Sequence, residues 1–191
     1  MRVLIACEFS GRVRDAFRAQ GHDALSCDLQ PSWTPGPHVQ GDVRDLLTDG
    51  WDLLVAFPPC RYLAASGARW WAERQQEQAA ALAFVRTLLA APIPRIALEN
   101  PVGRISTAIR LPDQIVQPWM FGHAEIKTTC LWLQGLPLLQ PTCLTFAPRT
   151  QRCWRMSPSP TRAMARSLTA PGIAQAMAQQ WSPPTAGEGT R

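Results

Sequence analysis

Short apolar runs alternate with amphipathic stretches along the first half of the chain. The runs are rich in Val, Leu, Ile and Ala and are bounded by glycine, proline or acidic residues, which is typical of buried strands. They cover residues 3–7, 24–27, 51–56 and 95–98. Strands that alternate with helical patterns in this way predict a mostly parallel sheet with helices on both faces.

Amphipathic helical patterns lie between and after these runs. In the first of them, Val13, Ala16 and Phe17 recur at helical spacing, and Gly21 is suited to end the helix. Its polar face carries Arg12, Arg14, Asp15 and Arg18. The further helical patterns cover residues 73–91 and 173–181.

The second half of the chain has fewer apolar runs. Two of them, residues 115–118 and 128–133, are close enough in sequence to pair as a hairpin that extends the sheet. The predicted fold class is therefore α/β, with a Rossmann-like, mostly parallel sheet and a late antiparallel hairpin.

We expect residues 1–181 to form a single domain. Within it, residues 29–40 are a proline-rich loop, residues 61–71 a mobile loop over the site, and residues 134–170 an irregular basic insert. Residues 182–191 are mostly small and polar, which predicts a disordered tail.

Composition narrows the classes of protein. With 46% hydrophobic and 17% charged residues, the chain has a globular composition and not a disordered one. The net charge of +5 is compatible with nucleic acid as a partner, although it does not require one. The six cysteines form no Cys-x-x-Cys pair, so we expect neither a metal site nor a disulfide framework. No stretch resembles a signal peptide or a membrane span, which predicts a cytoplasmic protein without a membrane partner.

One strand ends in an unusual way. The run 51–56 is followed by Phe57, Pro58, Pro59 and Cys60. Proline donates no ladder hydrogen bond and holds the preceding residue extended, so the strand stops there and displays Cys60 on a stiff turn. Ligands of open α/β sheets bind at the carboxyl ends of the strands, which makes Cys60 a candidate nucleophile. The alternative is an ordinary buried cysteine beside a loop.

Other strand ends carry groups suited to a nucleoside. The first strand leads into Glu8-Phe9-Ser10-Gly11, a turn whose glycine lets a ligand approach the backbone closely. Asp28 ends the second strand, where it can accept hydrogen bonds from ribose hydroxyls. Asp42 follows the proline-rich loop and can either bond an adenine amino group or cap a short helix, and both interpretations stay open.

A carboxylate ends the strand expected beside that of Cys60. Glu99 follows the run 95–98, and it lies 39 residues after Cys60, enough for one loop, one helix and one strand. The two strands are then neighbours, so Cys60 and Glu99 face one pocket. The alternative is a loop carboxylate that caps a backbone group.

Taken together, these motifs resemble the cytosine-5 DNA methyltransferases, in the short phage or prophage form that lacks a target-recognition domain. The resemblance covers about residues 2–181, and the spacing of the cysteine and glutamate motifs is its specific part. The matching motifs are Glu8-Phe9-Ser10-Gly11, Asp28, Asp42, Phe57-Pro58-Pro59-Cys60, Glu99-Asn100-Pro101-Val102, Phe121-Gly122 with residues 127–133, and Pro171-Gly172-Ile173-Ala174.

The resemblance implies a methyltransferase fold and the transfer of a methyl group from S-adenosylmethionine to carbon-5 of cytosine in DNA. Cys60 would add to carbon-6 as a thiolate, with Arg61 as a candidate for lowering its pKa. Glu99 would bond the ring nitrogen and the amino group, and Lys127 is nearest to the arginine that orients the ring in the family. The cofactor would lie across Glu8, Phe9, Ser10, Gly11, Asp28, Asp42, Phe57 and Pro58.

Two departures from the family keep other functions open. Lysine does not reproduce the planar fork of arginine. Only about 40 residues separate Trp132 from the closing helix, too few for a recognition domain of ordinary size. Sequence recognition would then be weak or supplied by a protein partner. The same fold could instead act on RNA or a free nucleotide, or the chain could be a non-catalytic cofactor-binding or DNA-binding partner.

Overall fold

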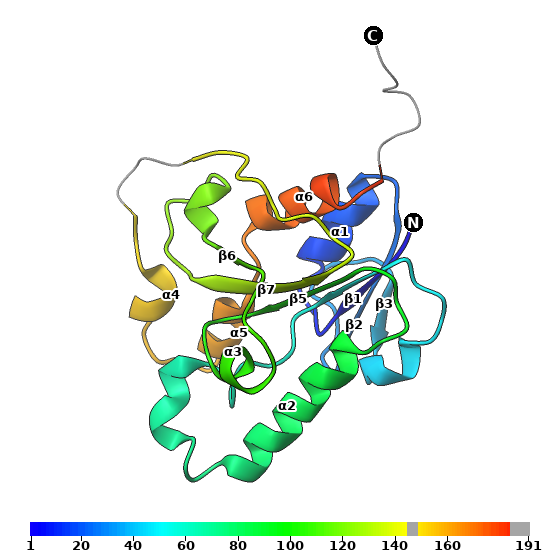
Figure 1. Cartoon of the computed structure of the whole chain (residues 1–191). Coiled ribbons are helices and arrows are strands. Elements are labelled where there is room, and N and C mark those ends of the chain that lie inside the picture. Colours follow the sequence, from blue (N-terminus) through cyan, green and yellow to red (C-terminus); the bar gives the residue numbers. More distant parts are fainter. Residues whose placement is uncertain (145–148, 184–191) are drawn as a thin grey trace.

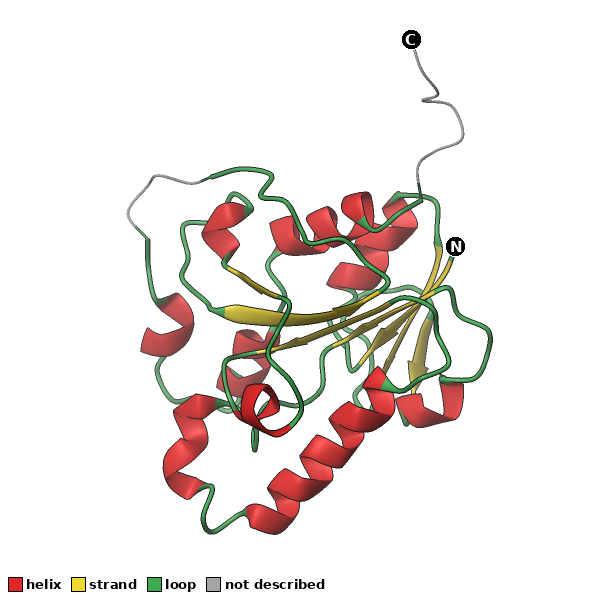
Figure 2. Ribbon diagram, viewed as in Figure 1, coloured by secondary structure: helices red, strands yellow, loops and turns green. Residues whose placement is uncertain are grey.

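A seven-stranded sheet forms the centre of the computed structural model, which describes residues 1–144 and 149–183 (Figures 1 and 2). The strand order is β3-β2-β1-β4-β5-β7-β6. The strands are β1 (Arg2–Ala6), β2 (Asp23–Asp28), β3 (His38–Gln40), β4 (Leu53–Ala56), β5 (Ile96–Asn100), β6 (Gln114–Val116) and β7 (Thr129–Gln134). The α-helices are α1 (Arg12–Ala19), α2 (Gln75–Leu89), α3 (Arg104–Ala108), α4 (Arg152–Arg155), α5 (Arg162–Ser167) and α6 (Pro171–Gln180). The 3-10 helices are η1 (Val43–Leu46), η2 (Ala65–Trp70) and η3 (Pro118–Met120).

The sheet is parallel from β3 to β5, and β7 runs antiparallel to both of its neighbours, β5 and β6. The expected late hairpin is therefore present, with β7 inserted between β5 and the edge strand β6. Strands that are covered on both faces need apolar residues throughout rather than at alternate positions. Strand β4 follows this rule, since all four of its residues are buried. The fold class predicted from the sequence is confirmed.

Helices cover both faces of the sheet. On one face α2, η1 and α3 pack against alternate residues of the central strands, such as Leu4, Leu54 and Leu98. On the other face α1 and α6 pack against the intervening residues, such as Ile5 and Val55, and against each other (Figure 1). Because β1, β2, β4 and β5 are parallel, their carboxyl ends meet at one edge of the sheet, and most of the predicted site residues lie at these ends. The exceptions are Asp42, which follows β3, and Lys127, which precedes β7.

Four sequence predictions about irregular segments need correction. The insert 134–170, predicted to be irregular, contains the short helices α4 and α5. The predicted loop 29–40 ends in β3, a short edge strand that carries no apolar run and so gives no strand signal. The predicted loop 61–71 contains η2. Ser182 is not part of a tail, because its hydroxyl donates to the carbonyl of Ala178 and contacts the ring of His22. The remaining tail residues 184–191 and part of the basic insert, residues 145–148, lie outside the described residues.

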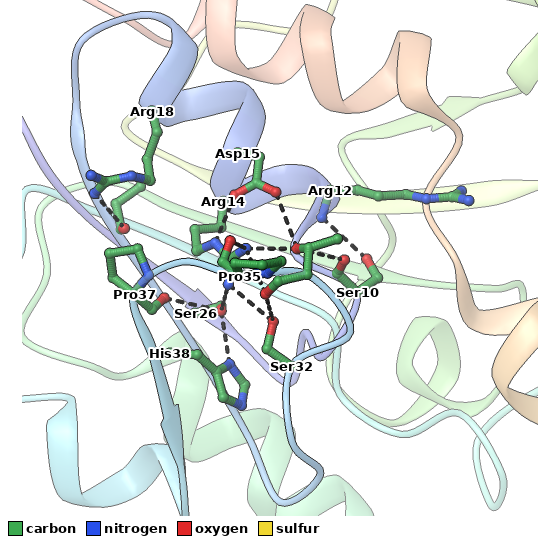
Figure 3. Close-up of polar contacts among 12 residues, drawn as sticks. Ser10, Arg12, Arg14, Asp15, Arg18, Ser26, Ser32, Pro35, Pro37 and His38 are labelled. Atoms are coloured by element: carbon green, nitrogen blue, oxygen red, sulfur yellow. Dashed lines mark hydrogen bonds and ion pairs between the residues drawn. The ribbon is translucent and has the colours of Figure 1, made fainter.

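Arg14 is the clearest departure from the sequence pattern. The pattern assigns it to the polar face of α1, but its side chain is fully buried. Its guanidinium donates hydrogen bonds to Asp15, to Ser26 on β2, and to the loop that follows β2 (Figure 3). The loop acceptors are the hydroxyls of Ser32 and Thr34 and the carbonyls of Thr34 and Pro35. Arg14 therefore fastens the proline-rich loop to α1 and β2.

In the described part of the chain, no helix combines the length and the apolar character needed to cross a membrane.

Candidate active site

The turn that carries Cys60 is held by its neighbours on both sides. The amide of Phe57 donates to the carbonyl of Ala6 at the end of β1, at 2.9 Å. Asn100, at the end of β5 and 1% exposed, donates from Nδ2 to the carbonyl of Pro58 at 2.7 Å. The two prolines end β4, and these two bonds fix the direction in which the chain leaves it.

Cys60 is exposed and begins a tight turn. Its carbonyl accepts hydrogen bonds from the amides of Leu63 at 3.0 Å and Ala64 at 2.9 Å. The alternative of an ordinary buried core cysteine is therefore wrong, and the thiol is displayed at the carboxyl end of β4.

Glu99 lies at the end of β5, the strand that pairs with β4. Burial raises the pKa of its carboxyl, while the charge of Lys127 and the hydroxyl of Thr129 act in the opposite direction. The three residues line one narrow pocket together with Pro118, Thr169, Ala170, Ile173 and Met177. The pocket thus joins the end of β5 to the β6–β7 hairpin and to α6.

Lys127 is fixed at both its ends. Its backbone amide donates to Oε1 of Gln117 and its Nζ donates to the carbonyl of Leu168, each at 3.0 Å. Leu168 lies between α5 and α6, so the lysine links the hairpin to the segment that leads into α6. Its ammonium group is thereby held by a backbone carbonyl in the pocket that it lines with Glu99.

The groups that shift the pKa of Cys60 are not the one predicted from the sequence, Arg61. Although the residue is exposed, protein groups around the thiol displace water, and this desolvation raises its pKa, as does the negative charge of Glu99. The positive charges of Lys127 and of Arg166 on α5 lower the pKa of Cys60. Arg61 was the candidate for this effect in the sequence prediction, but its guanidinium lies over the ring of Tyr62, 5.4 Å from the centroid. The charges of Glu99, Lys127 and Arg166 therefore act on the Cys60 thiol, although Cys60 is not among the residues that line the pocket of Glu99 and Lys127.

A second cluster lies at the ends of β1 and β2. Glu8 is buried, and it accepts a hydrogen bond at Oε1 from the hydroxyl of Ser10. Burial raises the pKa of Glu8, and the main opposing groups are the Ser10 hydroxyl and the amide of Val13 in α1. Its second oxygen, Oε2, is buried and has no hydrogen-bond partner. A buried carboxylate oxygen without a partner is suited to accept a hydrogen bond from a cationic ligand group.

Cys7 directly follows β1 and precedes Glu8 in the chain. It is the one non-glycine residue with positive φ in the described part of the chain, at 58°. Burial raises its pKa to about 12, and the nearby charges of Asp28 and Asp42 contribute to the rise. The half-buried Asp28 accepts a hydrogen bond from the amide of Gln30 at 2.9 Å. Cys7 directly follows β1 and Asp28 ends the parallel strand β2, so both lie at the same edge of the sheet.

Of the two interpretations left open for Asp42, the structure shows the helix cap. Its side chain accepts a hydrogen bond from the amide of Arg44 at 2.9 Å at the start of η1, and it also pairs with the guanidinium of Arg44. The hydrogen bonds from Arg44 lower the pKa of Asp42 to about 2. The carboxylate is therefore already engaged on the side that faces Arg44.

The Gly11 turn is packed more closely than the sequence indicates. A Cβ at Gly11, where φ is 75°, would come within 2.0 Å of the Thr34 hydroxyl. Phe9 stacks edge-on against Trp33, with the ring centroids 4.8 Å apart. The absence of a side chain at Gly11 therefore lets the proline-rich loop, rather than a ligand, pack against this turn. The loop lies beside Phe9 and Ser10 at this edge of the sheet.

Three residues that structure the site were assigned no such role from the sequence. Asn100 belongs to the Glu99-Asn100-Pro101-Val102 motif, but its hydrogen bond to Pro58 joins the ends of two strands, and no local sequence pattern predicts it. The buried position of Arg14 and the approach of Arg166 to Cys60 also depend on contacts between distant segments. A basic residue in an irregular stretch gives no indication of its partner.

No protein-family model and no curated protein matches this sequence. Solved structures do match in fold. One is described as a DNA modification methyltransferase encoded within a prophage of E. coli, with a TM-score of 0.51 and 16% identity. It is matched over 83% of this chain and 56% of its own length. A methyltransferase of Entamoeba histolytica matches with a TM-score of 0.51 and 12% identity, over 83% of this chain and 60% of its own. The chain thus spans less than two thirds of these proteins, and it has a Rossmann-like methyltransferase fold.

Proposed function

We propose that this protein transfers a methyl group from S-adenosylmethionine to carbon-5 of cytosine in DNA, through a covalent adduct with Cys60. The observation that carries the proposal is the position of Cys60 and Glu99 at the ends of paired parallel strands, with Lys127 near enough to shift the pKa of both. A displayed thiol beside a carboxyl of raised pKa is suited to attack on an electron-poor ring that the carboxyl activates.

The chain's own residues account for the steps on the ring. The Cys60 thiolate forms a bond to carbon-6, and the electron pair of the 5,6 double bond makes carbon-5 nucleophilic. Bound S-adenosylmethionine supplies an electrophilic methyl group on its sulfonium. When carbon-5 takes the methyl group, the bond between that methyl group and the sulfonium would break and leave a neutral thioether. Carbon-5 would then lose its proton to a water molecule, the double bond would re-form, and the bond between the Cys60 sulfur and carbon-6 would break, which restores the thiolate.

Glu99 is suited to recognise and activate cytosine. Its raised pKa favours a protonated carboxyl, which donates to the ring nitrogen N3 while its other oxygen accepts from the exocyclic amino group. The positive charge of Lys127 favours the ionised form, so the lysine stabilises the carboxylate that remains after the proton moves toward N3. Lys127 also favours the thiolate of Cys60.

The residues at the ends of β1 and β2 fit the cofactor. The unpartnered Oε2 of Glu8 can accept a hydrogen bond from the ammonium of the methionine part. Asp28 lies at the position suited to ribose hydroxyls, and Phe9, Ser10, Gly11, Phe57 and Pro58 form the turns beside it. Asp42 is bound to Arg44, so an adenine contact through its side chain requires an oxygen that Arg44 leaves accessible.

The test is transfer of a labelled methyl group to DNA, followed by digestion to nucleosides and mass spectrometry. We expect 5-methyldeoxycytidine from the native protein and none from Cys60→Ser. The matched control is Cys143→Ser, which changes another exposed cysteine and should keep full transfer. Methylated product from Cys60→Ser would contradict the covalent mechanism. Product on RNA alone would replace DNA as the acceptor, and absence of cofactor binding would overturn the proposal.

A further inference from the structure

The segment that follows Cys60 carries an unusual surface of arginines and aromatic rings. It runs from residue 61 to residue 74, and its η2 part projects from the body of the protein beside the start of α2 (Figure 1, teal). We call it the arginine–aromatic surface; its rings are Tyr62, Trp70 and Trp71, and its cations are Arg61, Arg69, Arg74 and Arg104.

Each ring of this surface has a guanidinium over its face. Arg69 lies 4.9 Å from the centroid of Trp70, and Arg74 lies 5.9 Å from the centroids of both Tyr62 and Trp70. Arg104, from the start of α3, lies 5.9 Å from the centroid of Trp71. Guanidinium groups and aromatic rings are both flat, and both are suited to stack with bases.

The positive charge of this surface exceeds its negative charge, since residues 61–74 hold three arginines and one acidic residue, Glu73. Within residues 1–144 and 149–183, none of its four arginines forms an ion pair with an acidic side chain. Trp70 is 42% exposed, which is high for a tryptophan. An exposed ring among guanidinium groups that form no ion pair, with two half-buried rings beside it, is a combination suited to the bases and phosphates of a nucleic-acid strand.

The root of the surface is fixed relative to Cys60. Leu63 and Ala64 donate to the carbonyl of Cys60, and the carbonyl of Leu63 accepts from the amide of Arg104 at 2.7 Å. A Cβ at Gly103 would come within 2.0 Å of the Leu63 carbonyl, so the two backbones touch. The surface therefore starts within two residues of the nucleophile and is held against the end of β5.

We propose that the arginine–aromatic surface binds an unpaired stretch of DNA beside the target cytosine, so that single-stranded or locally melted DNA is the preferred acceptor. The inference rests on the proposed function and adds the class of its substrate. Rings and guanidinium planes can stack only with bases that are free of their own partners. A base in a duplex must also leave the helix to reach Cys60, which costs a few kcal/mol that an unpaired strand avoids. Stacking of this kind is independent of sequence, which fits the short stretch between β7 and α6.

The test compares binding of one fluorescent cytosine-containing oligonucleotide, single-stranded and annealed to its complement, by anisotropy at constant salt and without methyl donor. We expect the single strand to bind about tenfold more tightly, since stacking of a base on an aromatic side chain contributes ~1–3 kcal/mol. Trp70→Ala should weaken single-strand binding about fivefold or more and leave duplex binding nearly unchanged. Arg69→Lys, which keeps the charge and removes the flat group, should also lower the preference. Arg18→Ala on α1 removes an exposed charge outside the surface and is the control.

Equal or tighter binding of the duplex by the native protein would overturn the inference. So would a loss in Trp70→Ala that is the same for both forms of DNA, because the ring would then not distinguish unpaired bases from paired ones. The result is independent of the proposed chemistry. A single-strand preference without methyl transfer would keep the binding surface but remove the proposed function, and with it the acceptor role of the bound strand. Methylation of duplex DNA without the preference would remove this inference and keep the proposed function.

Discussion

Removal of the hydrogen bond between Asn100 and Pro58 should reduce catalytic activity more than it reduces stability. Asn100→Ala removes the hydrogen bond of 2.7 Å from Nδ2 and leaves the buried carbonyl of Pro58 without this donor. An unsatisfied buried acceptor costs about 1–3 kcal/mol. The side chain also holds a buried Oδ1 without a partner, whose removal offsets part of this loss. We therefore expect a loss in the free energy of unfolding of about 1–2 kcal/mol, or ~2–8 °C in Tm for a chain of this size.

The effect on catalysis should be larger, because the lost bond is one of two that fix the turn carrying Cys60. A small displacement of a reacting group can lower the rate about a hundredfold. The assay is single-turnover methyl transfer beside thermal unfolding of the same samples. Gln114→Ala is the matched control, since Gln114 tethers the backbone of Leu139 by two amide hydrogen bonds far from Cys60. If Asn100→Ala lost no more activity than Gln114→Ala at equal loss of Tm, the positioning role of Asn100 would be refuted.

Three further predictions concern buried or titrating groups. Arg14→Met should lower the free energy of unfolding by about 2–4 kcal/mol, because several loop groups lose their donor, and proteolysis should cut residues 29–37 faster than in the exposed control Arg18→Met. The rate at which iodoacetamide alkylates Cys60, measured by mass spectrometry, should rise only at pH values above the ordinary pKa of a thiol. Lys127→Met should shift this pH–rate profile to still higher pH, and a lower apparent pKa in that variant would contradict the prediction. An unfolded thiol ionises near pH ~8.5, whereas Cys7 keeps its proton to about 12. Its contribution to stability is therefore fully present below ~8.5 and declines above it, so urea unfolding should show a smaller loss from pH 8 to pH 10 in Cys7→Ala.

The sequence patterns predict the central sheet well because burial on both faces demands continuous apolar residues. The runs at 3–7 and 51–56 overlap β1 and β4 for this reason. Strand β3 is missed because a three-residue edge strand needs no apolar run and Val39 is partly exposed. Local pattern therefore predicts the strands that the core requires and overlooks those held by backbone pairing alone.

The site could be predicted only as far as topology determines it. Because parallel strands end at one edge, the positions of Cys60 and Glu99 follow from their places after two neighbouring strands. The prediction that Arg61 lowers the pKa of Cys60 is wrong because adjacency in sequence does not fix direction, and the Arg61 side chain turns to Tyr62. Lys127 and Arg166 come from segments far along the chain, and only the folded structure brings them near the thiol.

The packing of α1 against α6 has a consequence for the order in which the protein folds. One face of β1 and β4 is fully covered only when residues 171–180 have packed beside the helix formed by residues 12–19. Contacts between such distant segments slow folding, because a long loop must close before they contribute. During synthesis the partly made chain therefore exposes Phe17, Ile5 and Val55 until the last helix emerges. Truncated chains that end before residue 171 should aggregate, and chaperones should bind them at this exposed apolar face.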